Sequence, residues 1–147
     1  MPSIIPGYVY SLFAALIVGT IIVCSCSLST LNIKNEAKNQ QLTNISKYVA
    51  TEGLNLLSYA TKDNQNATQF LNLPSQIGNQ IYWIQIANDS SGVWAESGFG
   101  TTVTSSPERI YVPANVGASG IFISSYGRAI LQCTSENQTV TLTLMSG

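Results

Sequence analysis

The sequence predicts an α+β protein, in which a long N-terminal hydrophobic and amphipathic α-helix precedes a C-terminal antiparallel β-sheet or small β-sandwich domain. Residues 8–26 carry no charge and few polar side chains, as in a membrane-spanning helix. Residues 34–60 repeat apolar side chains at steps of three and four, which is typical of an amphipathic helix. Beyond residue 62, short β-branched and aromatic runs end at turn-forming residues. We therefore expect a hydrophobic helix over residues 1–33, an amphipathic helix over 34–61 and an exterior β domain over 62–147.

The hydrophobic segment is long enough to cross a bilayer. Nineteen residues at 1.5 Å each span about 28 Å, close to the thickness of the hydrocarbon core. A removed secretory signal is the alternative, but the segment lacks a basic start, a short apolar core and an Ala-x-Ala exit. The favoured interpretation is a retained anchor.

Small residues recur every four positions in this segment, at Ser11, Ala15 and Gly19. Such a stripe allows a second helix to approach closely within an apolar medium, although small residues are also common in membrane helices generally. The candidate helix-packing residues are Tyr8, Leu12, Ala15, Leu16, Gly19, Ile22 and Val23.

The amphipathic part has one stripe to bury, formed by Leu42, Ile45, Val49, Gly53, Leu56 and Ala60. We expect this stripe to pack against the β domain, because about 80 residues of sheet alone would be marginally stable. The hydrophobic half of the helix is then expected to protrude. Residues 25–30, four of which carry hydroxyl groups, form its weakest section, where bending or melting is expected because these hydroxyl groups compete for backbone hydrogen bonds.

Seven short runs are candidate strands. They cover residues 68–73, 80–87, 93–95, 109–112, 120–124, 128–134 and 139–145. In the last run Val140, Leu142 and Leu144 alternate with threonines, which predicts a half-buried strand. Trp83 and Trp94 are expected to pack in the core or at its rim, with a sugar-stacking face as the alternative.

Composition excludes several functions. Only 9% of residues are charged, against roughly 25% in ordinary soluble proteins, and the net charge is −1. No nucleic-acid binding is expected without a basic face. The chain has no histidine, and no phosphate loop, metal-ligand cluster or nucleophile–base pair is recognisable. We therefore expect that the protein is not an enzyme and has no catalytic site, metal site or cofactor.

Two smaller groups of residues have plain interpretations. The five carboxylates of the second half are expected to be solvated surface charges: Asp63, Asp89, Glu96, Glu108 and Glu136. Cys24 and Cys26 are expected to be small apolar helix residues, since a Cys-x-Cys pair without a second pair is a weak metal or redox signal. Cys133 is expected on a strand.

Four Asn-x-Ser/Thr motifs are candidate N-glycosylation sites: Asn44, Asn66, Asn88 and Asn137. The last three fall in expected loops or turns, whereas Asn44 lies on the helix. These motifs favour an exterior β domain. Lys34, Lys38 and Lys47 follow the apolar segment and favour the opposite orientation by the positive-inside rule. We favour the exterior, because an uncharged surface rich in Ser, Thr and Asn suits exposure outside the cell.

The stretch GYVYSLFAALIVG from Gly7 to Gly19, followed later by LNLPSQIG from Leu71 to Gly78, resembles the archaeal branch of the type IV pilin-like superfamily. This branch comprises pilins, archaellins and archaellum accessory proteins. The resemblance implies that residues 1–33 lie in membrane lipid before assembly and in a filament core afterwards. It also implies an assembly ATPase and a membrane platform protein as partners, besides copies of the chain in a helical filament used for adhesion or motility.

The resemblance leaves one alternative, a membrane-anchored accessory protein whose β domain binds an envelope layer or a filament at a pilus or archaellum base. Two family features are missing from the printed sequence. These are the basic residue and glycine cleaved by prepilin peptidase, and the glutamate near the mature N-terminus of bacterial pilins. Either a leader has been removed or the chain belongs to an unprocessed accessory branch.

Overall fold

The computed structural model describes residues 4–63, 65–104, 108–136 and 139–147. These residues form one helix followed by seven strands, which confirms the predicted α+β architecture. The chain divides into two compact units, Met1–Ala37 and Lys38–Gly147. Each unit is described by itself below.

Helix α1 spans Ile4–Asp63 and includes residues 25–30, where the sequence predicts bending or melting. These residues are helical, so the expected melting is wrong, and their hydroxyl groups donate to carbonyl oxygens four residues back in the same helix. Ser25 donates to the carbonyl oxygen of Ile21 at 2.9 Å, and Thr30 donates to that of Cys26 at 2.8 Å. Ser27 and Ser29 make the same bond four residues back, each at 2.9 Å.

The strands form a single sheet and not a sandwich. They are β1 (Ala67–Leu71), β2 (Tyr82–Asp89), β3 (Gly92–Phe99), β4 (Ile110–Val112), β5 (Gly117–Ile123), β6 (Ala129–Glu136) and β7 (Thr139–Ser146). Their order is β1-β6-β7-β5-β2-β3-β4. Neighbours are antiparallel except for β5 and β7, which are parallel.

Strand β3 is longer than the sequence predicts. The prediction ends it at Ala95 and places a loop after it, but the strand continues to Phe99 because residues 96–99 pair with the first half of β2. Gly98 is part of this extension. A Cβ atom there would lie 2.6 Å from the ring of Trp83, so the glycine makes room for the indole. Trp83 and Trp94 are both buried, which confirms their expected packing role.

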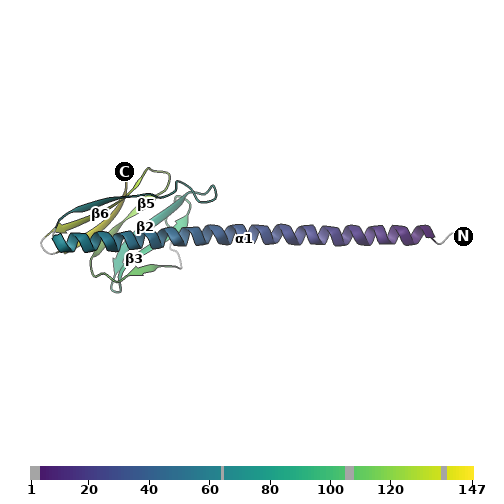
Figure 1. The fold of residues 1–147 in the computed structure, drawn as a ribbon, viewed down its shortest axis with the longest axis horizontal. Helices are drawn as coiled ribbons and strands as arrows, with labels where there is room; N and C mark the ends of the chain where they lie inside the picture. Colours follow the sequence, from purple (N-terminus) through teal and green to yellow (C-terminus); the bar gives the residue numbers. More distant parts are fainter. Residues whose placement is uncertain (1–3, 64, 105–107, 137–138) are drawn as a thin grey trace. The chain divides into compact units, whose positions relative to one another are not determined.

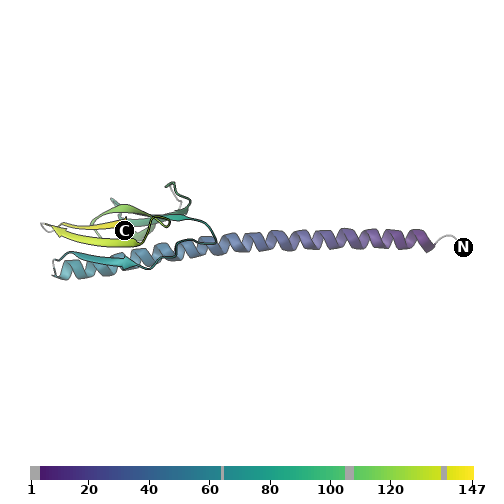
Figure 2. The ribbon, with the colours of Figure 1, turned by 90° about the horizontal axis from the view of Figure 1, so that it is seen from above.

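Within the unit Lys38–Gly147, the last part of α1 lies along one face of the sheet (Figures 1 and 2). The predicted stripe of the helix is buried, which confirms this packing: Leu42, Ile45, Val49, Gly53, Leu56 and Ala60. It shares one core with sheet residues such as Phe122, Leu131 and Leu144. A Cβ atom at Gly53 would lie 3.1 Å from Leu142 Cδ2, so glycine permits the close approach of helix and sheet. In β7, Leu142 and Leu144 are buried while the intervening Thr143 is half-buried, as predicted.

The segment Leu71 to Gly78 ends in a tight turn before β2. Ile77 and Gln80 exchange two backbone hydrogen bonds of 3.0 Å. Gly78 and Asn79 between them have φ angles of 53° and 64°, a region that glycine and asparagine tolerate best. The side-chain stem of Lys38 lies against Gly78, and its Nζ donates to Gln80 Oε1 at 3.4 Å. This contact joins the start of the helical part of the unit to the start of β2.

Candidate functional site

The candidate site is an exposed apolar surface on α1 in the unit Met1–Ala37. The large apolar side chains between Tyr8 and Ile33 are 47–78% exposed. The helix is long and apolar enough to cross a membrane, with a mean hydropathy of 2.3 in its most apolar stretch. Exposure of so many apolar side chains to water is unfavourable, at about 25 cal/mol per Å². This surface therefore requires lipid or other protein around it.

The polar groups of this segment are satisfied within the helix. Ser11 donates to the carbonyl oxygen of Tyr8 at 2.9 Å, and Thr20 donates to that of Leu16 at 2.6 Å. With the four bonds of residues 25–30, every serine and threonine hydroxyl from residue 8 to 30 has an acceptor in its own helix. Because an unpaired hydroxyl in hydrocarbon costs several kcal/mol, this pattern suits an apolar surrounding.

A shallow apolar groove runs along one side of the segment. It is lined by Leu12, Ala15, Leu16, Gly19, Thr20 and Val23. The structure thus brings together five of the seven residues predicted to pack helices, whereas Tyr8 and Ile22 are exposed on the same helix outside this lining. Thr20 was missed because it is polar, although its spacing of four from Leu16 could have identified it. A Cβ atom at Gly19 would meet nothing within 4 Å, so the groove is open there.

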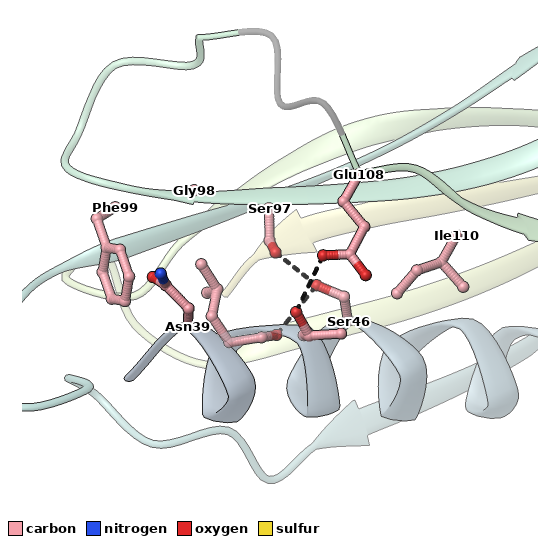
Figure 3. A pocket seen from close by; sticks show the side chains of 9 residues that line it. Asn39, Ser46, Ser97, Gly98, Phe99, Glu108 and Ile110 are labelled. Carbon is pink, nitrogen blue, oxygen red and sulfur yellow. Dashed lines mark hydrogen bonds between the residues drawn. The ribbon is translucent and has the colours of Figure 1, made fainter. Parts of the chain in front are cut away.

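A second hollow, of about 310 Å³, lies between α1 and strands β3 and β4 in the unit Lys38–Gly147 (Figure 3). Ser46 and Ser97 face each other across it, with their Oγ atoms 2.6 Å apart. Thr43 Oγ1 lies 3.4 Å from Glu108 Oε2. These hydroxyl groups are hydrogen-bonded to each other, to the helix backbone or to a carboxylate. We therefore interpret the hollow as a polar part of the helix–sheet interface. Among the described residues, no group of three His, Cys, Asp or Glu side chains could hold a metal ion.

Glu96 is not a solvated surface charge, and the expectation for this residue is wrong. Its side chain is only 3% exposed, on the face of β3 opposite to the helix. Arg109 explains the burial, because its Nε donates to Glu96 Oε2 at 3.1 Å and its guanidinium stacks on Trp94 at 4.2 Å. Hydrogen bonds with Tyr111 and Glu96 raise the pKa of Arg109. The expectation holds for Asp89 and Glu108, which are exposed, while the side chains of Asp63 and Glu136 lie outside the described residues.

The candidate glycosylation sites differ in their surroundings. Asn44, Asn66 and Asn88 are exposed, and Asn137 lies outside the described residues. Asn66 Oδ1 accepts the backbone N–H of Ser135 at 3.1 Å, and Asn88 Oδ1 accepts that of Ala118 at 3.2 Å. Ser46, the hydroxyl residue of the motif that begins at Asn44, is buried. Of the three candidates that the structure describes, Asn66 and Asn88 combine an anchored amide with an exposed position at the end of the sheet, and Asn44 does not.

Comparisons with protein-family models, curated proteins and solved structures gave no match to this chain.

Proposed function

We propose that the chain is a structural subunit of an archaeal type IV pilus-like extracellular filament, which serves adhesion or motility. The observation that carries this proposal is the exposed apolar surface of α1, from Tyr8 to Ile33. A membrane-inserted state before assembly and a bundle of such helices after assembly both cover this surface. The sheet domain then faces outward, where its low charge and its Ser, Thr and Asn content suit the exterior.

The transfer from lipid to filament sets the energetic requirement. Lipid tails are as apolar as leucine, so the hydrophobic effect does not drive helices together within a membrane. Close packing must supply the difference, and it needs small residues where two helices meet. Ala15 and Gly19 line the open groove and allow this approach. In this proposal an assembly ATPase and a membrane platform protein move subunits from lipid into the filament.

The same apolar helix also fits the runner-up function, a membrane-anchored accessory protein whose sheet domain binds an envelope layer or a filament at a pilus or archaellum base. Its helix would stay in lipid permanently. Such an anchor tolerates a larger residue in the groove, because lipid adapts to the shape of a helix. The two functions therefore differ in their response to substitution at Gly19.

The test is Gly19→Leu, with Ala14→Leu as its matched control. Both changes add a leucine side chain to the apolar segment, but Ala14 does not line the groove. We expect Gly19→Leu to abolish filaments on the cell surface, since the added side chain keeps neighbouring helices apart, and Ala14→Leu to retain them. Thermal unfolding of the sheet domain should be unchanged in both. Normal filaments from Gly19→Leu would contradict the packing role of the groove.

A further inference from the structure

We propose that Asn66 and Asn88 carry N-linked glycans attached to the folded sheet domain, and that Asn44 does not. The inference rests on the exterior position of the sheet domain in the proposed function, but not on polymerisation. In the reaction, a bond forms between Nδ2 and the first sugar carbon of a lipid-linked oligosaccharide. The bond from that carbon to the carrier phosphate breaks, the phosphate leaves with its lipid, and Nδ2 loses one proton to a base of the transferase.

The amides of Asn66 and Asn88 are held by the oxygen atom, not the nitrogen atom. Each Oδ1 accepts a backbone N–H, from Ser135 at 3.1 Å and from Ala118 at 3.2 Å. Since a carboxamide is planar, this bond turns Nδ2 to the opposite side of the group. Both residues are exposed, as a transferase requires to reach the atom that forms the glycosidic bond. The hydrogen bond to Oδ1 can persist after glycosylation and would orient the first sugar.

The transferase must recognise the hydroxyl group two residues after the asparagine. The exposure of this hydroxyl group differs between Asn44 and the other two sites. Thr68 and Ser90 are exposed. Ser46 is 2% exposed, and its Oγ lies 2.6 Å from Ser97 Oγ beneath the helix. Freeing it would require α1 to unwind between the buried Leu42 and Val49. The folded domain therefore offers two complete acceptors among the described residues and withholds the one on the helix.

Both acceptors lie at the same end of the sheet. Across the sheet, Ala67 pairs with Cys133, Cys133 with Leu142, and Leu142 with Ala118. Asn88 lies one residue beyond the pair of Ala87 and Ser119, and therefore beside Ala118. Asn66 comes directly before Ala67, so four strand spacings separate the two sites, or about 19 Å. Lys38 contacts Gln80 in the turn before β2, at the opposite end of that strand and eight residues, or about 26 Å, from Asn88. The glycans would thus lie together at the end remote from Lys38.

The test is mass spectrometry of peptides from the full chain taken from the surface of its source cells. Chymotryptic cleavage separates the two sites, because Phe70 and Trp83 lie between them. We expect sugar on Asn66 and Asn88 and none on Asn44. Thr68→Ala should remove the sugar from Asn66 alone, and Thr68→Ser should retain it. Asn88→Asp keeps the oxygen acceptor for Ala118 but removes the glycan, which separates modification from folding.

The outcomes are decisive for each position. An unmodified Asn66 or Asn88 in surface-exposed protein would overturn the proposal for that residue, and a glycan on Asn44 would overturn the selection by structure. Failure of the proposed function has a different signature. Filaments with bare asparagines would contradict only the glycan inference, whereas a glycosylated chain that never polymerises would contradict only the filament.

Discussion

Tyr82 shows how burial changes a single side chain in the sheet domain. It is fully buried, packs edge-on against the ring of Phe122 and donates its hydroxyl hydrogen to the carbonyl oxygen of Pro74 at 2.6 Å. Removal from water disfavours the phenolate and raises the pKa of Tyr82 to about 12. The hydroxyl joins the start of β2 to the loop that precedes it.

This pKa predicts an alkaline loss of stability. Because the folded state holds the proton more tightly than the unfolded state, Tyr82 contributes fully below pH 10 and loses its contribution between pH 10 and about 12. Tyr82→Phe should cost about 1 kcal/mol at neutral pH through the lost hydrogen bond. The variant should also show a weaker decline than the wild type over that pH range. Urea unfolding at several pH values measures both, and parallel declines would contradict the assignment.

The three cysteines should differ sharply in reactivity. Cys24 and Cys26 are exposed on α1, whereas Cys133 is fully buried in β6, where burial raises the pKa of its thiol. We expect a small, membrane-permeant maleimide to label Cys24 and Cys26 in the detergent-solubilised chain, and to label Cys133 only after the sheet domain unfolds. Cys133→Ala should leave the labelling of the native chain unchanged. Equal labelling of all three thiols before unfolding would show that the core is not closed around Cys133.

For single residues, the sequence predicted burial correctly where apolar side chains recur at helical spacing. The buried positions of Leu42, Val49 and Ala60 follow from helical spacing, and no partner had to be known. Glu96 and Ser46 could not be found in this way, because each is a polar residue whose burial depends on a distant partner, Arg109 or Ser97. Such pairings arise from tertiary structure and leave no signal in local sequence.

At the scale of elements, β5 depends on one glycine. Gly120 has a φ of 135°, which disfavours any side chain, and a Cβ atom there would collide with the backbone of Leu144 in β7. The position lies between β2 and β7, in the parallel pair of the sheet. The close approach of β5 and β7 at this position therefore requires glycine.

We expect Gly120→Ala to lower the free energy of unfolding by at least about 2 kcal/mol, through the strained φ and the backbone collision. Gly117→Ala is the matched control in the same strand, because a Cβ atom there meets Thr141 Oγ1 at an ordinary 3.4 Å. Its effect should stay within about 1 kcal/mol. Chemical denaturation of the two variants measures the difference, and equal stabilities would contradict the geometry of β5.

The sequence predicted the elements better than their arrangement. The alternation in β7 and the turn residues between runs identified most strands, but the length of β3 was hidden by Gly98, which reads as a loop residue. The choice between a sheet and a sandwich could not be made, since pairing partners such as β1 and β6 are far apart in the chain. Strand order depends on those long-range pairs.

At the scale of the whole molecule, the chain joins two units with opposite solvent requirements. The unit Lys38–Gly147 buries its own core, with Leu131 and Ile84 fully covered. The described large apolar side chains of Met1–Ala37, by contrast, are exposed along α1. Their apolar character was predictable from composition alone. We propose a polymer because copies of the same helix would cover these side chains. The basis for choosing this partner is the family resemblance of the sequence.

The most direct measurement is the identification of peptides in filaments sheared from the surface of cells that produce the chain, with electron microscopy of the same fraction. We expect this chain to be a major component of the filaments, with residues 8–33 protected from protease inside them. Recovery of the chain only from the membrane fraction, as a monomer absent from every filament preparation, would contradict it.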